Sequence, residues 1–258
     1  MTVTNERRVL VHSNKESLGA SVAARFITKI IDVLEEQNYA SIVVSGGSVS
    51  TLVLAAINAS PARDSVDWSR VSFWWADERW VEAGHADRND HQAGLDLLDH
   101  IGVDPENVHR FGAVGEFDDV EAAASAYRAE LQEHAQGDDA SPRFDITLLG
   151  VGPDGHIASL FPDKPQIRDA SSTVLTIDDS PKPPPVRLTL SLPAINNSQR
   201  VWMILAGAEK ASSLGLALAG AGADQVPVAG VKGRKRTVFF VDGDAAAEVP
   251  ENLIASTY

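Results

Sequence analysis

Short apolar segments alternate with longer amphipathic segments along almost the whole chain. Strands are predicted at residues 8–12, 42–44, 71–76, 108–111, 144–149, 174–177, 186–190, 201–205 and 237–241. Apolar residues at helical spacing predict helices at 18–33, 51–57, 89–100, 120–134 and 209–218. Parallel strands need a long crossover connection, usually a helix, so this alternation predicts a mostly parallel sheet. The predicted fold is therefore α/β: a single doubly wound, Rossmann-like domain spanning residues 1–258, with helices on both faces of the sheet.

Local signals add detail to two of these helices and to one loop. Ser13 and Glu16 have the spacing of a capping box and predict where the first helix starts. Asn89 is a suitable cap for the helix that follows it. Residues 178–185 are polar and proline-rich, which marks this loop as the candidate mobile segment, and whether it acts as a lid is open.

Polar and glycine-rich motifs follow several predicted strands, at the sheet edge where open α/β folds bind ligands. Ser45-Gly46-Gly47-Ser48 connects strand 42–44 to a helix start. Backbone amides of such a turn can cradle a phosphate with help from the helix dipole, but an ordinary tight turn is an equally good interpretation. Asp77, Glu78 and Arg79 follow strand 71–76, and packed charges of this kind are costly unless they are paired or used.

The motif after strand 144–149 contains Gly150, Gly152 and Gly155 and formally matches a dinucleotide-binding pattern. We reject that interpretation because Asp154 would place a carboxylate beside the pyrophosphate, and Pro162 would end the crossover helix too early. The same turn carries His156 next to Asp154. An imidazole oriented by a carboxylate is the usual general base near pH 7.

Composition excludes several other functions. The chain has 22 Lys and Arg against 36 Asp and Glu, a net charge of −14, which argues against nucleic acid or an anionic membrane as a partner. A small anionic ligand in a cleft stays compatible with that charge. The basic group of Lys232, Arg234, Lys235 and Arg236 is best interpreted as a solvated turn.

No metal, cofactor or membrane segment is predicted. The chain has no cysteine, and His85, Asp87, Asp90 and His91 lack a regular metal-ligand spacing. No apolar run approaches the ~20 residues that span a bilayer. The first eight residues lack the apolar core of a signal peptide, so a cytoplasmic location is expected.

Taken together, the motifs resemble the family of 6-phosphogluconolactonases and glucosamine-6-phosphate deaminases, and the lactonases in particular. The motifs that carry the resemblance occur in family order over nearly the whole chain: residues 45–48, 76–81, 87–89, 149–162, 187–190 and 207–210. The longest, Leu149 to Pro162, is highly specific. One departure is Val49-Ser50, where the family often has Thr-Pro; backbone amides contact the phosphate, so little depends on it.

The resemblance implies hydrolysis of 6-phosphoglucono-δ-lactone to 6-phosphogluconate in the pentose phosphate pathway, without a cofactor. It implies that His156 activates the attacking water and that Asp154 or Asp77 holds its imidazole. The phosphate would lie against Ser45, Gly46, Gly47 and Ser48, with Arg79, Arg187 and Lys210 as cationic partners. The oxyanion donors, the oligomeric state and the choice between the two aspartates stay open.

Two alternatives belong to other functional classes. One is the sister enzyme that isomerises and deaminates glucosamine-6-phosphate. In those deaminases a glutamate stands seven residues after the aspartate of the shared motif, and Phe161 occupies that position here. We expect Phe161 to form an apolar wall beside the turn. The other alternative is a non-catalytic sugar-phosphate sensor, which the lack of a DNA-binding segment disfavours.

Overall fold

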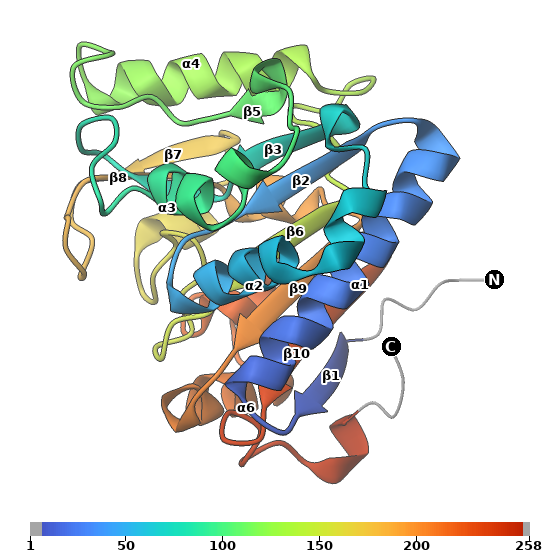
Figure 1. Ribbon diagram of the computed structural model, residues 1–258. Coiled ribbons are helices and arrows are strands. Elements are labelled where there is room, and N and C mark those ends of the chain that lie inside the picture. Colours follow the sequence, from blue (N-terminus) through green and yellow to red (C-terminus); the bar gives the residue numbers. More distant parts are fainter. Residues whose placement is uncertain (1–6, 255–258) are drawn as a thin grey trace.

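The computed structural model describes residues 7–254, except for the side chain of Val49 (Figure 1). Residues 1–6, most of the N-terminal segment on which the expected cytoplasmic location depends, lie outside these residues. The strands are β1 (Arg7–His12), β2 (Ala40–Val44), β3 (Val71–Trp75), β4 (Asp77–Arg79), β5 (Val108–His109), β6 (Ile146–Gly150), β7 (Val174–Ile177), β8 (Arg187–Leu190), β9 (Arg200–Leu205) and β10 (Arg236–Asp242). The α-helices are α1 (Lys15–Gln37), α2 (Ser48–Ala59), α3 (Asn89–Asp96), α4 (Val120–Glu133), α5 (Leu192–Asn196) and α6 (Ala211–Leu218). Within the described residues, none of the helices is long and apolar enough to cross a membrane.

Seven strands form one sheet in the order β1-β10-β9-β6-β2-β3-β5, and every neighbouring pair is parallel. Consecutive residues of β2 and β9 are buried, which is expected where both faces of a parallel sheet are covered. Figure 1 shows α1 and α2 side by side in front of this sheet. The α/β fold with a parallel sheet is thus confirmed.

The direction of winding changes between β2 and β6, which are neighbours in the middle of the sheet. From β2 the chain proceeds outward to β3 and β5, whereas from β6 it proceeds the other way to β9 and β10. A crevice forms where two such halves diverge, outside the carboxyl ends of the strands. The Gly-rich motifs that follow β2 and β6 are therefore placed side by side at the edge where a ligand is expected.

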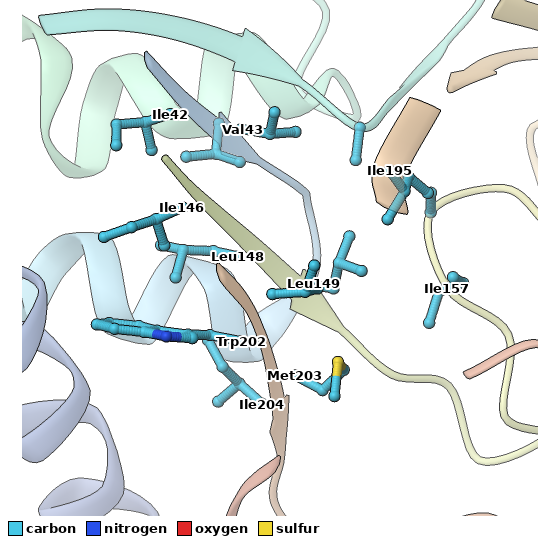
Figure 2. Close-up of a cluster of buried hydrophobic side chains, with 14 of the residues drawn as sticks. Ile42, Val43, Ile146, Leu148, Leu149, Ile157, Ile195, Trp202, Met203 and Ile204 are labelled. Atoms are coloured by element: carbon cyan, nitrogen blue, oxygen red, sulfur yellow. The ribbon is translucent and has the colours of Figure 1, made fainter. Parts of the chain in front are cut away.

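The core lies against these central strands, as Figure 2 shows. Ile42 and Val43 of β2 and Leu148 and Leu149 of β6 are 0–1% exposed, and alternate residues serve opposite faces of the sheet. The cluster continues into the turn after β6, where Ile157 is fully buried. The turn that carries His156 is thus anchored by the side chain of the next residue.

A second, three-stranded antiparallel sheet has the order β4-β8-β7. The segments 174–177 and 186–190 are strands, as predicted, but they do not join the parallel sheet. Residues 77–79, placed by the sequence after the strand that ends at residue 76, form the short strand β4, in which Asp77 pairs with Thr189 and Arg79 with Arg187. This pairing places the charged motif after β3 next to Arg187.

Two predicted helix starts are wrong in detail. The first helix is capped by Asn14, which accepts from the Ser17 amide, rather than by Ser13 with Glu16. An asparagine caps as well as a serine, and the Ser17 hydroxyl completes the box. Asn89 is the first residue of α3 rather than its cap, and this helix ends at Asp96 instead of near residue 100.

Candidate active site

A cavity of about 200 Å³ opens at the divergence point between β2 and β6. Every predicted site residue lines it except Asp154, which contacts His156. The lining residues are Ser45, Gly46, Gly47, Ser48, Asp77, Arg79, Asn89, Gly150, Val151, Gly152, Pro153, His156, Ala158, Lys182, Arg187 and Lys210. A larger cavity of about 450 Å³ lies near α3 and α4 and shares none of these residues. We place the candidate site in the smaller cavity because the motifs converge there.

His156 and Asp154 form a hydrogen-bonded pair at the cavity wall. Nδ1 of His156 lies 2.5 Å from Oδ1 of Asp154, so the carboxylate fixes the ring and accepts the Nδ1 proton. Nε2 has no hydrogen-bond partner among the described residues and is left available to the cavity. Partial burial acts to raise the pKa of Asp154, but the hydrogen bond and charge of His156 and the charge of Lys182 hold that pKa well below its ordinary value.

The pair packs directly on Gly152. A Cβ atom at residue 152 would lie 1.9 Å from Nδ1 of His156 and 2.5 Å from Oδ1 of Asp154, so no side chain fits there. The Gly152 amide donates to the His156 carbonyl over 2.9 Å, which closes the turn. The imidazole also stacks on Phe161, with ring centroids 4.7 Å apart. The apolar wall expected of Phe161 is present, and the ring of His156 contacts both this wall and Gly152.

Asp77 lies in the same cavity but is bonded elsewhere. The residue is 4% exposed, and its Oδ2 accepts from the Ser159 hydroxyl over 2.7 Å. Its Oδ1 accepts from the Asn89 amide group over 3.2 Å. Of the two aspartates left open by the sequence, the one bonded to the imidazole is Asp154.

The turn after β2 presents the N-terminus of α2 to the cavity. Gly47 is the N-cap, with φ of 93°, and no side chain caps the helix. Gly46 must lack a side chain because a Cβ atom there would meet Oδ1 of Asn89 at 1.7 Å. Ser45 is buried, and its hydroxyl accepts from the Gly150 amide over 3.1 Å, which ties the two Gly-rich turns together.

Arg79 lines this cavity, and one edge of its guanidinium has no hydrogen-bond partner among the described residues. Its Nη1 donates to the carbonyl of Asp87 over 2.7 Å and to Oδ1 of Asn89 over 2.5 Å. Its Nε is buried and without a partner, and Nη2 makes no hydrogen bond to the described residues. The Nε–Nη2 edge of a guanidinium matches two oxygens of a phosphate. Arg79 is thus oriented by the protein and left with a bidentate donor edge.

Arg187 and Lys210 differ in how far their donors are occupied. Arg187 donates through Nε to the Pro184 carbonyl and through Nη2 to the carbonyls of Lys182 and Pro183, at 3.0–3.1 Å. Nη1 reaches the Ser159 hydroxyl at 3.4 Å, so one of the five N–H groups is left over. Lys210 has no hydrogen-bonded partner for its ammonium among the described residues, and burial lowers its pKa.

Three polar residues near the cavity were missed by the sequence analysis. Asn89 links Arg79 to Asp77, and Lys182 places its Nζ 3.3 Å from Nδ1 of His156. Glu78 is fully buried and accepts from the amides of Asn89 and Asp90, so it caps α3 from a distance. Burial raises the pKa of Glu78 to about 8. Asn89 and Glu78 lie within the motifs that carry the family resemblance. The sequence therefore shows their positions but not their roles.

Two of the residues considered for a metal have other surroundings. Asp90 forms a two-pronged ion pair with the buried Arg88 at 2.9 Å, and His85 is on the exposed surface. Among residues 7–254 no group of three or more histidine, aspartate or glutamate side chains is arranged to hold a metal ion.

Comparison with known proteins gives consistent matches. A family model described as glucosamine-6-phosphate isomerases/6-phosphogluconolactonase matches residues 13–240. A 6-phosphogluconolactonase of Streptomyces coelicolor is 46% identical, over 95% of this chain and 96% of its own. One of Mycobacterium tuberculosis is 39% identical, over 93% and 97%. The solved 6-phosphogluconolactonase of Trypanosoma brucei superposes with a TM-score of 0.83 at 25% identity, covering 96% of this chain and all of its own.

Proposed function

The chain belongs to the glucosamine-6-phosphate isomerase/6-phosphogluconolactonase family and is a lactone hydrolase of the pentose phosphate pathway, and we propose that it hydrolyses 6-phosphoglucono-δ-lactone with His156 as general base. The observation that carries this mechanism is the Asp154–His156 pair at the wall of a cavity that also holds Arg79 and Lys210. We treat residues 1–258 as one cytoplasmic domain that needs no cofactor and takes a small sugar-phosphate lactone as its partner.

In the proposed reaction, Nε2 of His156 accepts a proton from water while the water oxygen attacks the lactone carbonyl carbon. Asp154 accepts the Nδ1 proton throughout and stabilises the imidazolium that forms. The tetrahedral intermediate then collapses with cleavage of the bond between the carbonyl carbon and the ring oxygen. His156 returns its proton to that oxygen as it leaves. Positioned acid–base catalysis of this kind is worth about 10²–10⁴-fold in rate.

The phosphate group would lie at the other end of the cavity. Its oxygens would accept from the amides of Gly46, Gly47 and Ser48 at the start of α2, where no side chain competes as a cap. Arg79 would supply its unused Nε–Nη2 edge, and Lys210 a point charge. Arg187 would contribute its remaining N–H and chiefly hold the neighbouring loop.

Replacing Arg79 or Lys210 with methionine should weaken use of the phosphorylated substrate selectively. Each change removes a charge-assisted hydrogen bond to phosphate worth about 1.5–3 kcal/mol, or roughly 10- to 10²-fold in kcat/KM. The measurement is kcat/KM on 6-phosphoglucono-δ-lactone and on unphosphorylated glucono-δ-lactone. The ratio of the two should fall in both variants. An unchanged ratio in both would place the phosphate elsewhere.

Glucosamine-6-phosphate should not be a substrate. Phe161 stands where the resemblance places the glutamate that assists ring opening in the deaminases, and its ring packs on His156. A phenyl ring neither accepts a proton nor polarises the imidazole. Incubation with glucosamine-6-phosphate should release no ammonia and form no fructose-6-phosphate. Turnover at a rate comparable to that on the lactone would reverse this assignment.

A further inference from the structure

We propose that Lys182 is a catalytic residue of this site: its ammonium stabilises the negative charge that develops on the lactone carbonyl oxygen. This inference rests on the proposed function of His156, because it concerns the same reaction. The observation behind it is the position of Nζ of Lys182, a residue that lines the cavity: Nζ lies 3.3 Å from Nδ1 of His156 and 3.9 Å from Oδ1 of Asp154.

The backbone that carries Lys182 is held firmly. The Lys182 carbonyl accepts from Nη2 of Arg187 over 3.0 Å and from the Ser180 hydroxyl over 2.8 Å. Arg187 is itself buried, at 4% exposed, and sits opposite Ile177 across the β7–β8 pair. The loop predicted as mobile is therefore held at the Lys182 carbonyl, and the lysine side chain extends from this point to His156.

The contact between Lys182 and His156 is not a lasting hydrogen bond. Nδ1 gives its proton to Asp154, so it cannot also accept a proton from the ammonium. Lysine has three donors on a flexible stem and, among the described residues, its Nζ has no other hydrogen-bond acceptor. The ammonium is thus close to the reacting groups with its donors unused.

The charges that form during the reaction define a role for the donors of Lys182. Before reaction the neutral imidazole lies between the negative Asp154 and the positive Lys182, and the three together carry no net charge. When water attacks, His156 becomes positive and the carbonyl oxygen negative. The like charge on the imidazolium then repels Lys182, and the new oxyanion attracts it. Without Lys182 the reacting groups would carry a net charge of −1 in a partly buried site.

The other cations of the cavity are less suited to this role. Arg187 has four of its five N–H groups engaged by protein oxygens. Arg79 is bound to Asn89, next to the Gly46 turn and the N-terminus of α2. Lys210 is the nearest competitor, since the charge of Lys182 contributes to lowering its pKa. A test must therefore distinguish the effect of Lys182 on the reaction from the effect of Lys210.

The two lysines are distinguished by comparing phosphorylated and unphosphorylated lactones. Lys182→Met, Lys182→Arg and Lys210→Met are assayed for kcat and KM on 6-phosphoglucono-δ-lactone and glucono-δ-lactone, corrected for spontaneous hydrolysis. Lys232→Met, which removes an exposed lysine, is the matched control. Because Lys182 is partly exposed, we expect its loss to lower kcat about 10- to 10²-fold, at or below the usual effect of an oxyanion donor.

The proposal predicts that Lys182→Met lowers kcat by the same factor on both lactones, and that Lys182→Arg restores part of it. Lys210→Met should instead lower the preference for the phosphorylated lactone. A loss in Lys182→Met confined to the phosphorylated lactone would make Lys182 a phosphate ligand, and no loss would remove it from the reaction; either result overturns the inference. Failure of the proposed function is distinct, since the His156→Ala protein would then keep the wild-type kcat on both lactones.

Discussion

Replacing His156 with alanine is expected to lower kcat on 6-phosphoglucono-δ-lactone about 10²–10⁴-fold. The change removes the proposed general base, and it leaves Asp154 without the ring to which it is bonded. KM should change much less, because the proposed phosphate contacts lie on the turn after β2 and on Arg79. The measurement is acid release from freshly prepared lactone, with the spontaneous rate subtracted.

The matched control is His85→Ala, which removes a surface histidine outside the cavity. It should retain wild-type activity. Circular dichroism and thermal melting should show that both variants are folded, since His156 lies in a turn that is anchored by Ile157 and closed by backbone hydrogen bonds. Wild-type kcat in a folded His156→Ala protein would eliminate this residue as the base.

Gly152→Ala is expected to lower kcat by about 10²-fold although it removes no functional group. The added Cβ would lie 1.9 Å from Nδ1 of His156, whose ring also stacks on Phe161. The imidazole must therefore move by an ångström or more, and misplacement of a catalytic group on that scale costs about 10²-fold in rate.

Gly102→Ala is the matched control for this variant, because a Cβ atom there meets nothing within 4 Å and the residue is exposed. It should leave both kcat and stability unchanged. A Gly152→Ala protein with normal kcat would mean that the observed packing of the Asp154–His156 pair is not needed for catalysis. A crystal structure of the variant would show how far the ring has moved.

The parallel sheet and most of the site were predictable because both follow from local patterns. Buried parallel strands appear as continuous apolar runs, and ligand-binding motifs follow them at their carboxyl ends. The Ser45–Ser48 turn and the His156 turn could thus be placed at one edge before their contacts were known. The second sheet could not be predicted, since periodicity identifies a strand but not its partner. Residues 77–79 gave no strand signal at all.

The roles of individual polar residues depended on tertiary contacts that no pattern contains. Arg187 was predicted to hold phosphate, yet most of its donors are taken by the carbonyls of the 182–184 segment. Lys182 lies in the loop that the sequence marks as the candidate mobile segment. Its position beside His156 depends on the hydrogen bonds by which Arg187 holds that loop. Asn89 was interpreted as a helix cap, but Glu78 binds the amides at that end and leaves the asparagine side chain to orient Arg79.

The most direct test of the account is acid release by the purified wild-type protein from fresh 6-phosphoglucono-δ-lactone, compared with the spontaneous rate and with glucono-δ-lactone under the same conditions. The account predicts catalysed release of one equivalent of acid per lactone, with a higher kcat/KM on the phosphorylated compound. Release no faster than the spontaneous rate would contradict the assignment of lactone hydrolysis to the Asp154–His156 cavity.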